Sequence, residues 1–138
     1  MRGKVFLDTN VFVYTQSKGE QDKRNIALNA IEKYECYTST QVFNEVSNVM
    51  IKKLKMPIDE VKQVITAIND RCTASIITHE AVQKALDLRE VYGYSYYDSL
   101  ILAAAVLNDC DYVFSEDLQD GQIIENKIEI VNIFKRSI

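Results

Sequence analysis

The chain has 138 residues, 47% of them hydrophobic and 26% charged, and its 16 basic and 20 acidic residues give a net charge of −4. This length and composition predict one globular domain over residues 1–138 and exclude a disordered chain. The longest apolar run, Leu100 to Leu107, is far shorter than the ~20 residues that span a bilayer, and no export signal precedes the first strand. We therefore expect a cytoplasmic protein that does not enter a membrane.

The counts of cysteine and histidine narrow the chemistry further. Cys36, Cys72 and Cys110 are far apart in the sequence and form no C-x-x-C pair for zinc, so we expect them to be reduced thiols in the core. His79 is the only histidine. A nuclease that uses two histidines is therefore excluded, and a Ser-His-Asp or Cys-His site would depend on this one residue.

The first predicted element is a strand over residues 5–7, where no polar residue alternates with the apolar ones, as in a strand buried on both faces. Asp8 follows this strand directly. An acid in this place most often caps the helix that follows. In an open parallel sheet, however, ligands bind at the carboxyl ends of the strands, so a functional acid is the alternative.

The rest of the chain alternates between helices and strands. Helical spacing of apolar residues predicts helices over residues 22–34, 41–54, 59–69, 79–91 and 95–108. Short segments between or after these helices predict further strands over residues 35–38, 74–77, 112–114 and 128–131. This alternation predicts an α/β fold, a three-layer α/β/α sandwich around a central parallel sheet of four to five strands.

Three further acids have positions that suit a shared site. Glu45 lies on the margin of the apolar stripe of its helix, so its carboxylate points near the core rather than opposite it. Asp98 lies in the first turn of an otherwise apolar helix, where Ser95 and Asp98 also have the spacing of a capping box. Asp117 follows the fourth strand as Asp8 follows the first, which would put both acids at one edge of the sheet.

Carboxylates gathered in one place repel one another unless a cation holds them. With one histidine and no cysteine pair, the available oxygen ligands suit Mg²⁺ or Mn²⁺ rather than zinc. Such an ion lowers the pKa of a bound water and stabilises the leaving oxygen of a phosphodiester. The acids therefore indicate hydrolysis that needs no histidine.

Four short motifs, each built around an acid, follow one another along nearly the whole chain. They are Asp8-Thr9-Asn10, Asn44-Glu45-Val46, Tyr97-Asp98-Ser99-Leu100-Ile101 and Ser115-Glu116-Asp117. In this order and at this spacing they resemble the acidic motifs of the PIN domain, a ribonuclease family that includes the VapC toxins of bacterial toxin-antitoxin pairs. The resemblance implies a Mg²⁺-dependent endoribonuclease, with Mn²⁺ as a substitute, that leaves 5′-phosphate and 3′-hydroxyl ends on RNA. It also implies a cognate antitoxin and a homodimer.

The resemblance assigns roles to individual residues. It implies that Asp8, Glu45, Asp98 and Asp117 form the catalytic metal site, with Asp8 and Asp98 as the direct ligands. Polar residues beside these acids would support them, namely Thr9, Asn10 and Ser115. Asp120 is a further acid within reach of the same loop, and the sequence alone leaves open whether Asp117 or Asp120 faces the metal.

Two other functions compete with this interpretation. A phosphatase of the haloacid dehalogenase type also begins with a strand and an Asp, but its general acid lies two residues on, where this chain has Asn10. A PIN-like module that binds RNA or a protein without cutting would be expected to have lost some of the acids. Lys52, Lys53 and Lys55 at a helix end are most often a solvated face, and the alternative hypothesis is that they and Lys23 with Arg24 contact RNA phosphates. Most of a run of tyrosines should pack, and one or two would stack on an unpaired base, namely among Tyr92, Tyr94, Tyr96 and Tyr97.

Overall fold

Across residues 3–138, which the computed structural model describes, the chain forms six strands and six helices. The strands are β1 (Lys4–Leu7), β2 (Glu35–Ser39), β3 (Thr73–Ser75), β4 (Tyr112–Phe114), β5 (Ile123–Ile124) and β6 (Ile128–Val131). The helices are α1 (Thr9–Tyr14), α2 (Gln21–Lys33), α3 (Thr40–Lys52), α4 (Ile58–Arg71), α5 (His79–Tyr92) and α6 (Tyr96–Leu107).

The strands form one sheet in the order β3-β2-β1-β4-β6-β5, in which only β5 runs antiparallel to its neighbour. β1 lies between β2 and β4, so its apolar residues Val5, Phe6 and Leu7 are fully buried. From β1 the chain first runs outward to β2 and β3 and later returns to place β4 on the other side. Parallel α/β sheets form their ligand crevice at such a reversal of strand order, beyond the carboxyl ends of the strands.

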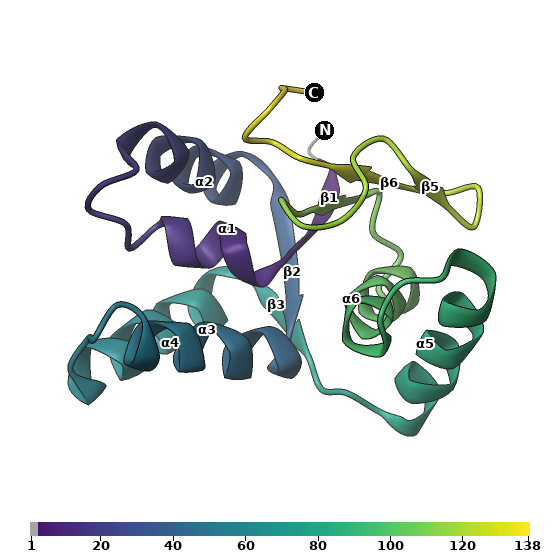
Figure 1. The fold of residues 1–138 in the computed structure, drawn as a ribbon, viewed down its shortest axis with the longest axis horizontal. Coiled ribbons are helices and arrows are strands. Elements are labelled where there is room, and N and C mark those ends of the chain that lie inside the picture. The colour runs from purple at the N-terminus through teal and green to yellow at the C-terminus, as the bar shows by residue number, and fades with distance from the viewer. Residues whose placement is uncertain (1–2) are drawn as a thin grey trace.

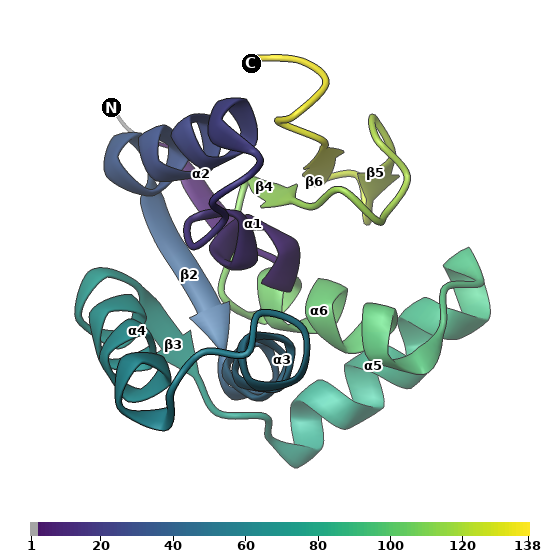
Figure 2. The same ribbon diagram turned by 60° about the vertical axis from the view of Figure 1, so that its left-hand side comes forward.

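Helices cover both faces of this sheet. Helices α1 to α4 lie on one side of the strands, and α5 and α6 lie on the other (Figure 1). In the turned view α5 and α6 again lie together, on the opposite side of the molecule from α2 and α4 (Figure 2). This is the arrangement that right-handed crossovers produce when strands are added first on one side of β1 and then on the other. The predicted α/β/α sandwich is confirmed.

Helix α6 is the central helix, as its apolar sequence predicts. All residues from Ser99 to Ala105 are buried, and the helix packs against α5 and against β1, β2 and β4. Because α6 precedes the parallel strand β4, it runs back along the sheet and begins near the carboxyl ends of the strands. Its first turn, which contains Asp98, is therefore fixed at the edge of the sheet that Asp8 follows.

Three elements differ from the predicted ones, the first being α1 (Thr9–Tyr14), which lies outside the five predicted helical ranges. The third strand ends at Ser75 rather than Ile77, because its pairing with β2 ends there and Ile76 is 76% exposed. The five parallel strands match the expected sheet, and β5 adds an antiparallel edge that the sequence analysis did not include. A turn in which Glu125 and Asn126 have positive φ angles joins β5 to β6.

The remaining predictions from composition concern cysteines and membranes. All three cysteines are buried, as expected for core residues. Burial raises the pKa of the Cys110 thiol to about 12, so this thiol stays protonated at neutral pH. Within residues 3–138, no helix combines the length and the apolar character that a bilayer-spanning segment needs.

Candidate functional site

The candidate site begins at Asp8, where β1 ends and α1 starts. The Asp8 backbone N–H donates to the carbonyl of Phe114 at 3.1 Å, which continues the pairing of β1 with β4 by one residue. Its carboxylate is buried, with 6% of the residue exposed. Oδ1 accepts from the Thr9 N–H at 2.7 Å and Oδ2 accepts from the Ser115 hydroxyl at 2.7 Å. Asp8 therefore caps α1 and also contacts the loop after β4.

The electrostatic state of Asp8 shows that its surroundings disfavour the negative charge. Burial, together with the smaller effect of the nearby charges of Glu45 and Asp117, raises the pKa of the Asp8 carboxyl from 3.8 to about 6. The hydrogen bonds from Ser115 and Thr9 act in the opposite direction and do not compensate. A cation beside Asp8 would remove this imbalance.

Glu45 reaches the same place from α3. Because α3 starts directly after β2, its second turn lies near the carboxyl ends of the strands. The Thr9 hydroxyl donates to Glu45 Oε1 at 2.9 Å, and the Gln41 amide nitrogen donates to Oε2 at 2.7 Å. Thr9 thus bonds to two of the four acids, to Asp8 with its backbone and to Glu45 with its side chain.

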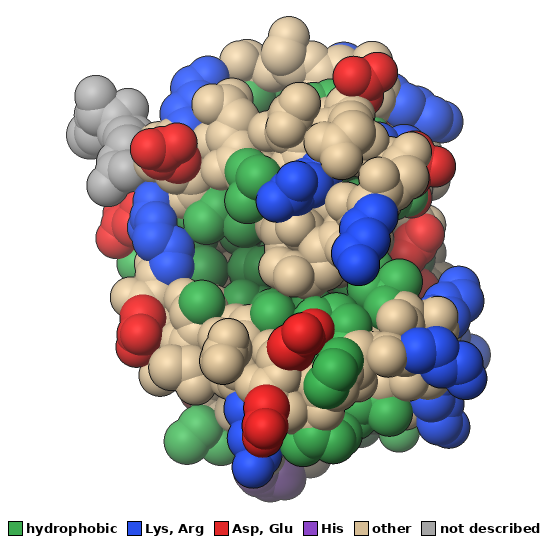
Figure 3. All heavy atoms as spheres, turned by 90° about the vertical axis from the view of Figure 1, so that its left-hand side faces the viewer, with side chains coloured by type: hydrophobic (Ala, Val, Ile, Leu, Met, Phe, Trp, Pro, Cys, Tyr) green, Lys and Arg blue, Asp and Glu red, His purple; other side chains and the backbone are tan. Residues whose placement is uncertain are grey.

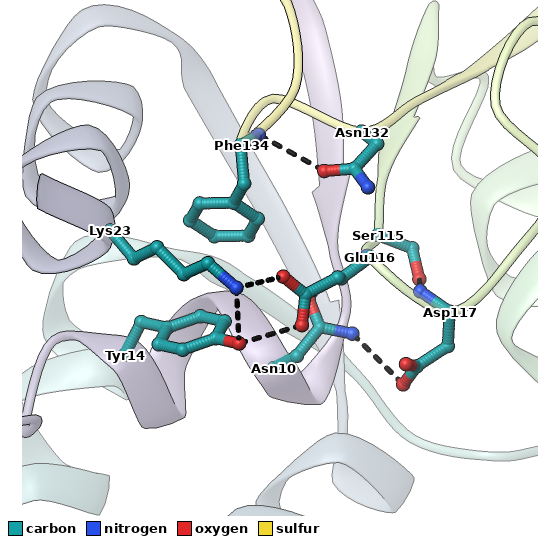
Figure 4. Close-up of polar contacts among 8 residues, drawn as sticks. All are labelled: Asn10, Tyr14, Lys23, Ser115, Glu116, Asp117, Asn132 and Phe134. Atoms are coloured by element: carbon teal, nitrogen blue, oxygen red, sulfur yellow. Dashed lines mark hydrogen bonds and ion pairs between the residues drawn. The ribbon is translucent and has the colours of Figure 1, made fainter. Parts of the chain in front are cut away.

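Asp117 is held over this edge by Asn10 and Ser115 (Figure 4). The Asn10 side-chain N–H₂ donates to Asp117 Oδ2 at 3.2 Å, and Asn10 Oδ1 accepts from the Glu116 N–H at 3.2 Å. The Asp117 N–H donates to the Ser115 hydroxyl at 3.1 Å, and this hydroxyl in turn donates to Asp8. The structure therefore brings Thr9, Asn10 and Ser115 into contact with the acids that they were expected to support.

Asp120 lies in the same loop and has different partners. Its carboxylate accepts from the Asn132 N–H at 2.9 Å and from Arg136 Nε at 3.0 Å. The Asn132 hydrogen bond and the Arg136 guanidinium hold the pKa of the Asp120 carboxyl below its usual value. Of the two acids in this loop, Asp117 is thus the one in contact with residues around Asp8.

Asp98 has the cap geometry that its sequence predicts. Its N–H donates to the Ser95 hydroxyl at 3.2 Å in the first turn of α6. Within residues 3–138 its carboxylate makes no hydrogen bond or ion pair to the other three acids. The link is indirect, since the carbonyl of the preceding residue, Tyr97, accepts from the Gln41 amide at 3.1 Å, and the same amide contacts Glu45.

The partners of these acids share one property, which is that they are neutral. In the part of the chain that the structure describes, no Lys or Arg forms a salt bridge with Asp8, Glu45, Asp98 or Asp117. As they stand, no three His, Cys, Asp or Glu side chains within residues 3–138 are grouped closely enough to hold a metal ion. The metal ligands that these side chains could provide are nevertheless carboxylate oxygens that are not neutralised by a salt bridge within residues 3–138. Such ligands suit a hard divalent cation.

A cluster of side chains around Glu116, the residue between Ser115 and Asp117, was not predicted from the sequence. Tyr14 donates to Glu116 Oε1 at 2.6 Å, and Lys23 donates to Oε2 at 2.7 Å (Figure 4). Lys23 also lies over the ring of Tyr14, 4.8 Å from its centre. These contacts fasten the Asp117 loop to α1 and α2. Lys23 was expected to contact RNA, and in the structure its charge is paired with Glu116.

The sequence can now be compared with known families. Residues 5–135 match the model of the PIN domain. The chain belongs to the PIN domain family. The resemblance inferred from the four acidic motifs is therefore confirmed, and this PIN domain covers nearly the whole chain. No curated protein matches the chain by sequence.

Solved structures with the same fold include several from toxin-antitoxin systems. One is VapC20 from Mycobacterium tuberculosis, described as a toxin that cleaves the sarcin-ricin loop, with a TM-score of 0.67 and 16% identity over 82% of this chain and 91% of that one. Another is a toxin-antitoxin complex from Klebsiella pneumoniae, with a TM-score of 0.69 and 20% identity over 94% and 97%. A third is VapBC2 from Rickettsia felis bound to a promoter DNA fragment, with a TM-score of 0.65 and 18% identity over 94% and 99%. At these identities the similarity shows that the PIN domain shares their fold.

Proposed function

We propose that this PIN domain is a Mg²⁺-dependent endoribonuclease and the toxin of a toxin-antitoxin pair. The observation that carries the proposal is the set of acids at one edge of the sheet, which come from four separate motifs and form no salt bridge within residues 3–138. Asp8, Glu45 and Asp117 are joined through Thr9, Ser115 and Asn10. Acids gathered in this way are costly to a protein that does not use them to bind a cation.

Asp8 and Asp98 would hold the metal, with Glu45 and Asp117 completing its surroundings. When bound, Mg²⁺ or Mn²⁺ supplies the charge that lowers the pKa of a water and stabilises the leaving oxygen of a phosphodiester. The protein's own residues set the orientation. Ser115 and the Thr9 N–H fix the two oxygens of Asp8, and the Thr9 hydroxyl fixes Glu45. Asn10 holds Asp117, so the side chains of three of the four acids are oriented by hydrogen bonds before substrate arrives.

The test is cleavage of end-labelled cellular RNA by the wild type and by Asp98→Asn, each with Mg²⁺, with Mn²⁺ and with a chelator. Asn retains the shape of the side chain and loses the charge, and the Ser95 hydrogen bond uses only the backbone of residue 98, so the cap survives. We expect discrete cuts that require metal and disappear in Asp98→Asn. Asp70→Asn, an exposed acid on α4, is the matched control and should cut like the wild type.

The alternative function is a PIN-like module that binds RNA or a protein without cutting it. It predicts no cutting by the wild type and metal-independent binding of RNA or a protein by wild type and Asp98→Asn alike. Intact positions for all four acids favour the nuclease over this alternative. Sequencing the ends of the cut RNA would identify the target and test the expected 5′-phosphate and 3′-hydroxyl ends.

A cognate antitoxin and a homodimer are part of the proposal. The Klebsiella and Rickettsia neighbours are toxin-antitoxin assemblies, which supports an antitoxin here. Hydrophobic side chains gather in a hollow on the face that carries α1 to α4 (Figure 3). A cleft of about 560 Å³ lies there, lined by side chains that include Leu28, Ile31, Met56, Val64 and Ile68. Sedimentation of the purified chain tests the dimer, and isolation of a small protein that stops cleavage tests the antitoxin.

A further inference from the structure

Gln41, in the first turn of α3, lies between two of the acidic motifs. It is 6% exposed and one helical turn before Glu45. Its amide nitrogen donates both to Glu45 Oε2 at 2.7 Å and to the Tyr97 carbonyl at 3.1 Å. The carbonyl belongs to the residue before Asp98, so one amide group joins the helix that carries Glu45 to the helix that carries Asp98.

These two contacts fix the orientation of the amide. A carboxylate and a carbonyl can only accept hydrogen bonds, so the nitrogen must face both of them. Turning the amide over would place Oε1 against two other oxygens and break both bonds. The direction of Oε1 is therefore determined by Glu45 and Tyr97, and not by a partner of its own.

Oε1 of Gln41 has no partner. Within residues 3–138 it is the one buried side-chain nitrogen or oxygen that makes no hydrogen bond. Buried polar atoms in folded proteins nearly always have a partner, and an exception calls for an explanation such as a missing water or ion. Because the amide nitrogen is held by Glu45 and Tyr97, Oε1 can gain a partner only from a hydrogen-bond donor or a cation that approaches it.

We propose that Gln41 is a positioning residue of the metal site, which fastens Glu45 to the first turn of α6 through its nitrogen and offers its oxygen to the hydrated divalent cation. This inference rests on the proposed function, since it assumes that the four acids bind a cation. An amide oxygen is a hard neutral acceptor that suits Mg²⁺ or its water ligands. Partners of this kind orient metal ligands and set the affinity of a site.

The test is direct binding of Mn²⁺ to the purified protein, measured by electron paramagnetic resonance of the free ion and without RNA. The variants are Gln41→Met, which has a similar length and no polar group, and Gln41→Asn, which keeps the amide and withdraws it by one methylene. Gln83→Met places the same substitution at an exposed helical site on α5 and is the matched control. Asp98→Asn defines binding that does not involve the site.

We expect Gln41→Met and Gln41→Asn to bind Mn²⁺ about 10-fold or more weakly, the scale found when a residue that orients a metal ligand is removed. Gln83→Met should bind like the wild type. Circular dichroism of each sample gives the folded fraction, so weak binding is compared among folded proteins only. A Gln41 with a merely structural role predicts a changed unfolding temperature with unchanged Mn²⁺ affinity per folded molecule, and this result would overturn the inference.

The outcomes separate this inference from the proposed function. Wild-type binding that is lost in Asp98→Asn and unchanged in Gln41→Met rejects the role of Gln41 and leaves the carboxylate site standing. Wild-type binding that is equal in Asp98→Asn, or absent altogether, rejects the carboxylate site and the inference with it. Weak binding in both Gln41 variants with normal binding in Gln83→Met supports both.

Discussion

Two groups of acids in this molecule differ in the charge of the side chains that contact them. Around Asp8, three acids are held by hydroxyl, amide and backbone donors, and within residues 3–138 none of them forms a salt bridge. At the other group, Arg136 pairs with Asp120 and with Glu129, at 3.0 Å and 2.8 Å. Each acid of the second group has a basic partner, whereas within residues 3–138 no acid of the first group forms a salt bridge. Partner chemistry, rather than the number of acids, thus distinguishes a candidate cation site from a structural network.

The largest expected difference between the groups lies in RNA cleavage. Asp117→Asn should reduce cleavage at least ~100-fold, the scale seen when one charge-stabilising group is removed from an active site. Asp120→Asn, three residues on, should leave the rate within a few-fold of wild type, because its carboxylate bonds to Asn132 and Arg136. The measurement is the initial rate of cleavage at saturating Mg²⁺. Equal losses in both variants would contradict the division into two groups.

The second prediction concerns stability as a function of pH. The folded-state pKa of Asp8 is raised to about 6 from 3.8, so between these values the folded protein binds more protons than the unfolded chain. Stability without metal should therefore fall as pH rises from about 4 to about 6, by roughly 2–3 kcal/mol. Asp8→Asn should remove this fall and unfold at higher urea concentration than the wild type at pH 7.5 with a chelator.

Asp120 provides the control of opposite sign. Because its pKa is lowered in the folded state, its contribution to stability is present above its unfolded pKa and is lost as pH falls through the folded value. Asp120→Asn should therefore lower the stability at neutral pH, where Asp8→Asn raises it. Urea unfolding curves of both variants at pH 4.5 and 7.5 test the two signs, and a common sign would refute the assignment of either carboxyl.

The third prediction tests whether RNA binds beside the acids around Asp8. Tyr97 precedes Asp98 and is 67% exposed, whereas its neighbour Tyr96 packs against the core. An exposed ring in this place suits an unpaired base, and stacking of this kind contributes ~1–3 kcal/mol per base. Tyr97→Ala should raise KM about 10-fold with little change in kcat, and Tyr97→Phe should behave like the wild type. The control is Ile123→Ala, because Ile123 on β5 pairs with Glu129 on β6 and so lies beside the acids that Arg136 contacts.

The smallest expected effect is on the salt dependence of RNA binding, and it distinguishes a lysine that forms a salt bridge from lysines that are exposed. Lys23 is engaged with Glu116, whereas Lys52, Lys53 and Lys55 are exposed at the end of α3. Neutralising the three exposed lysines should flatten the dependence of RNA binding on salt, by up to ~0.7 in log–log slope for each RNA phosphate that these lysines neutralise. Lys23→Gln should leave that slope unchanged and lower the unfolding temperature. A larger change of slope in Lys23→Gln would show that its pairing with Glu116 opens on RNA.

The sequence predicted the elements around the site better than those at the edge of the sheet. Residues 5–7 and 112–114 are apolar, residues 128–131 are apolar except for Glu129, and all three segments form strands of the parallel sheet, as expected. β5 has two residues, and its turn uses Glu125-Asn126 in place of the Asn-Gly or Asp-Gly that signals a hairpin. The extra edge strand is thus formed by pairing with β6, which local sequence does not encode.

The candidate site could be predicted from the sequence only in part. The four acids follow from their positions at strand ends and in the early turns of helices, and Thr9, Asn10 and Ser115 follow from adjacency. Gln41 has one local signal, its spacing of four residues from Glu45. Its contact with Tyr97 depends on how α3 packs against α6, and the choice between Asp117 and Asp120 depends on where Arg136 lies. These are tertiary facts that no motif contains.

The bonds Ser115–Asp8 and Asn10–Asp117 each join residues that are 107 positions apart in the chain. Asp8 and Asn10 are therefore synthesised well before their partners. A nascent chain therefore has no complete arrangement of acids until β4 and the loop after it have emerged and paired with β1. Under the proposed function, a product that stops before β4 lacks the partners of Asp8 and Asn10 and is expected to be inactive as a nuclease.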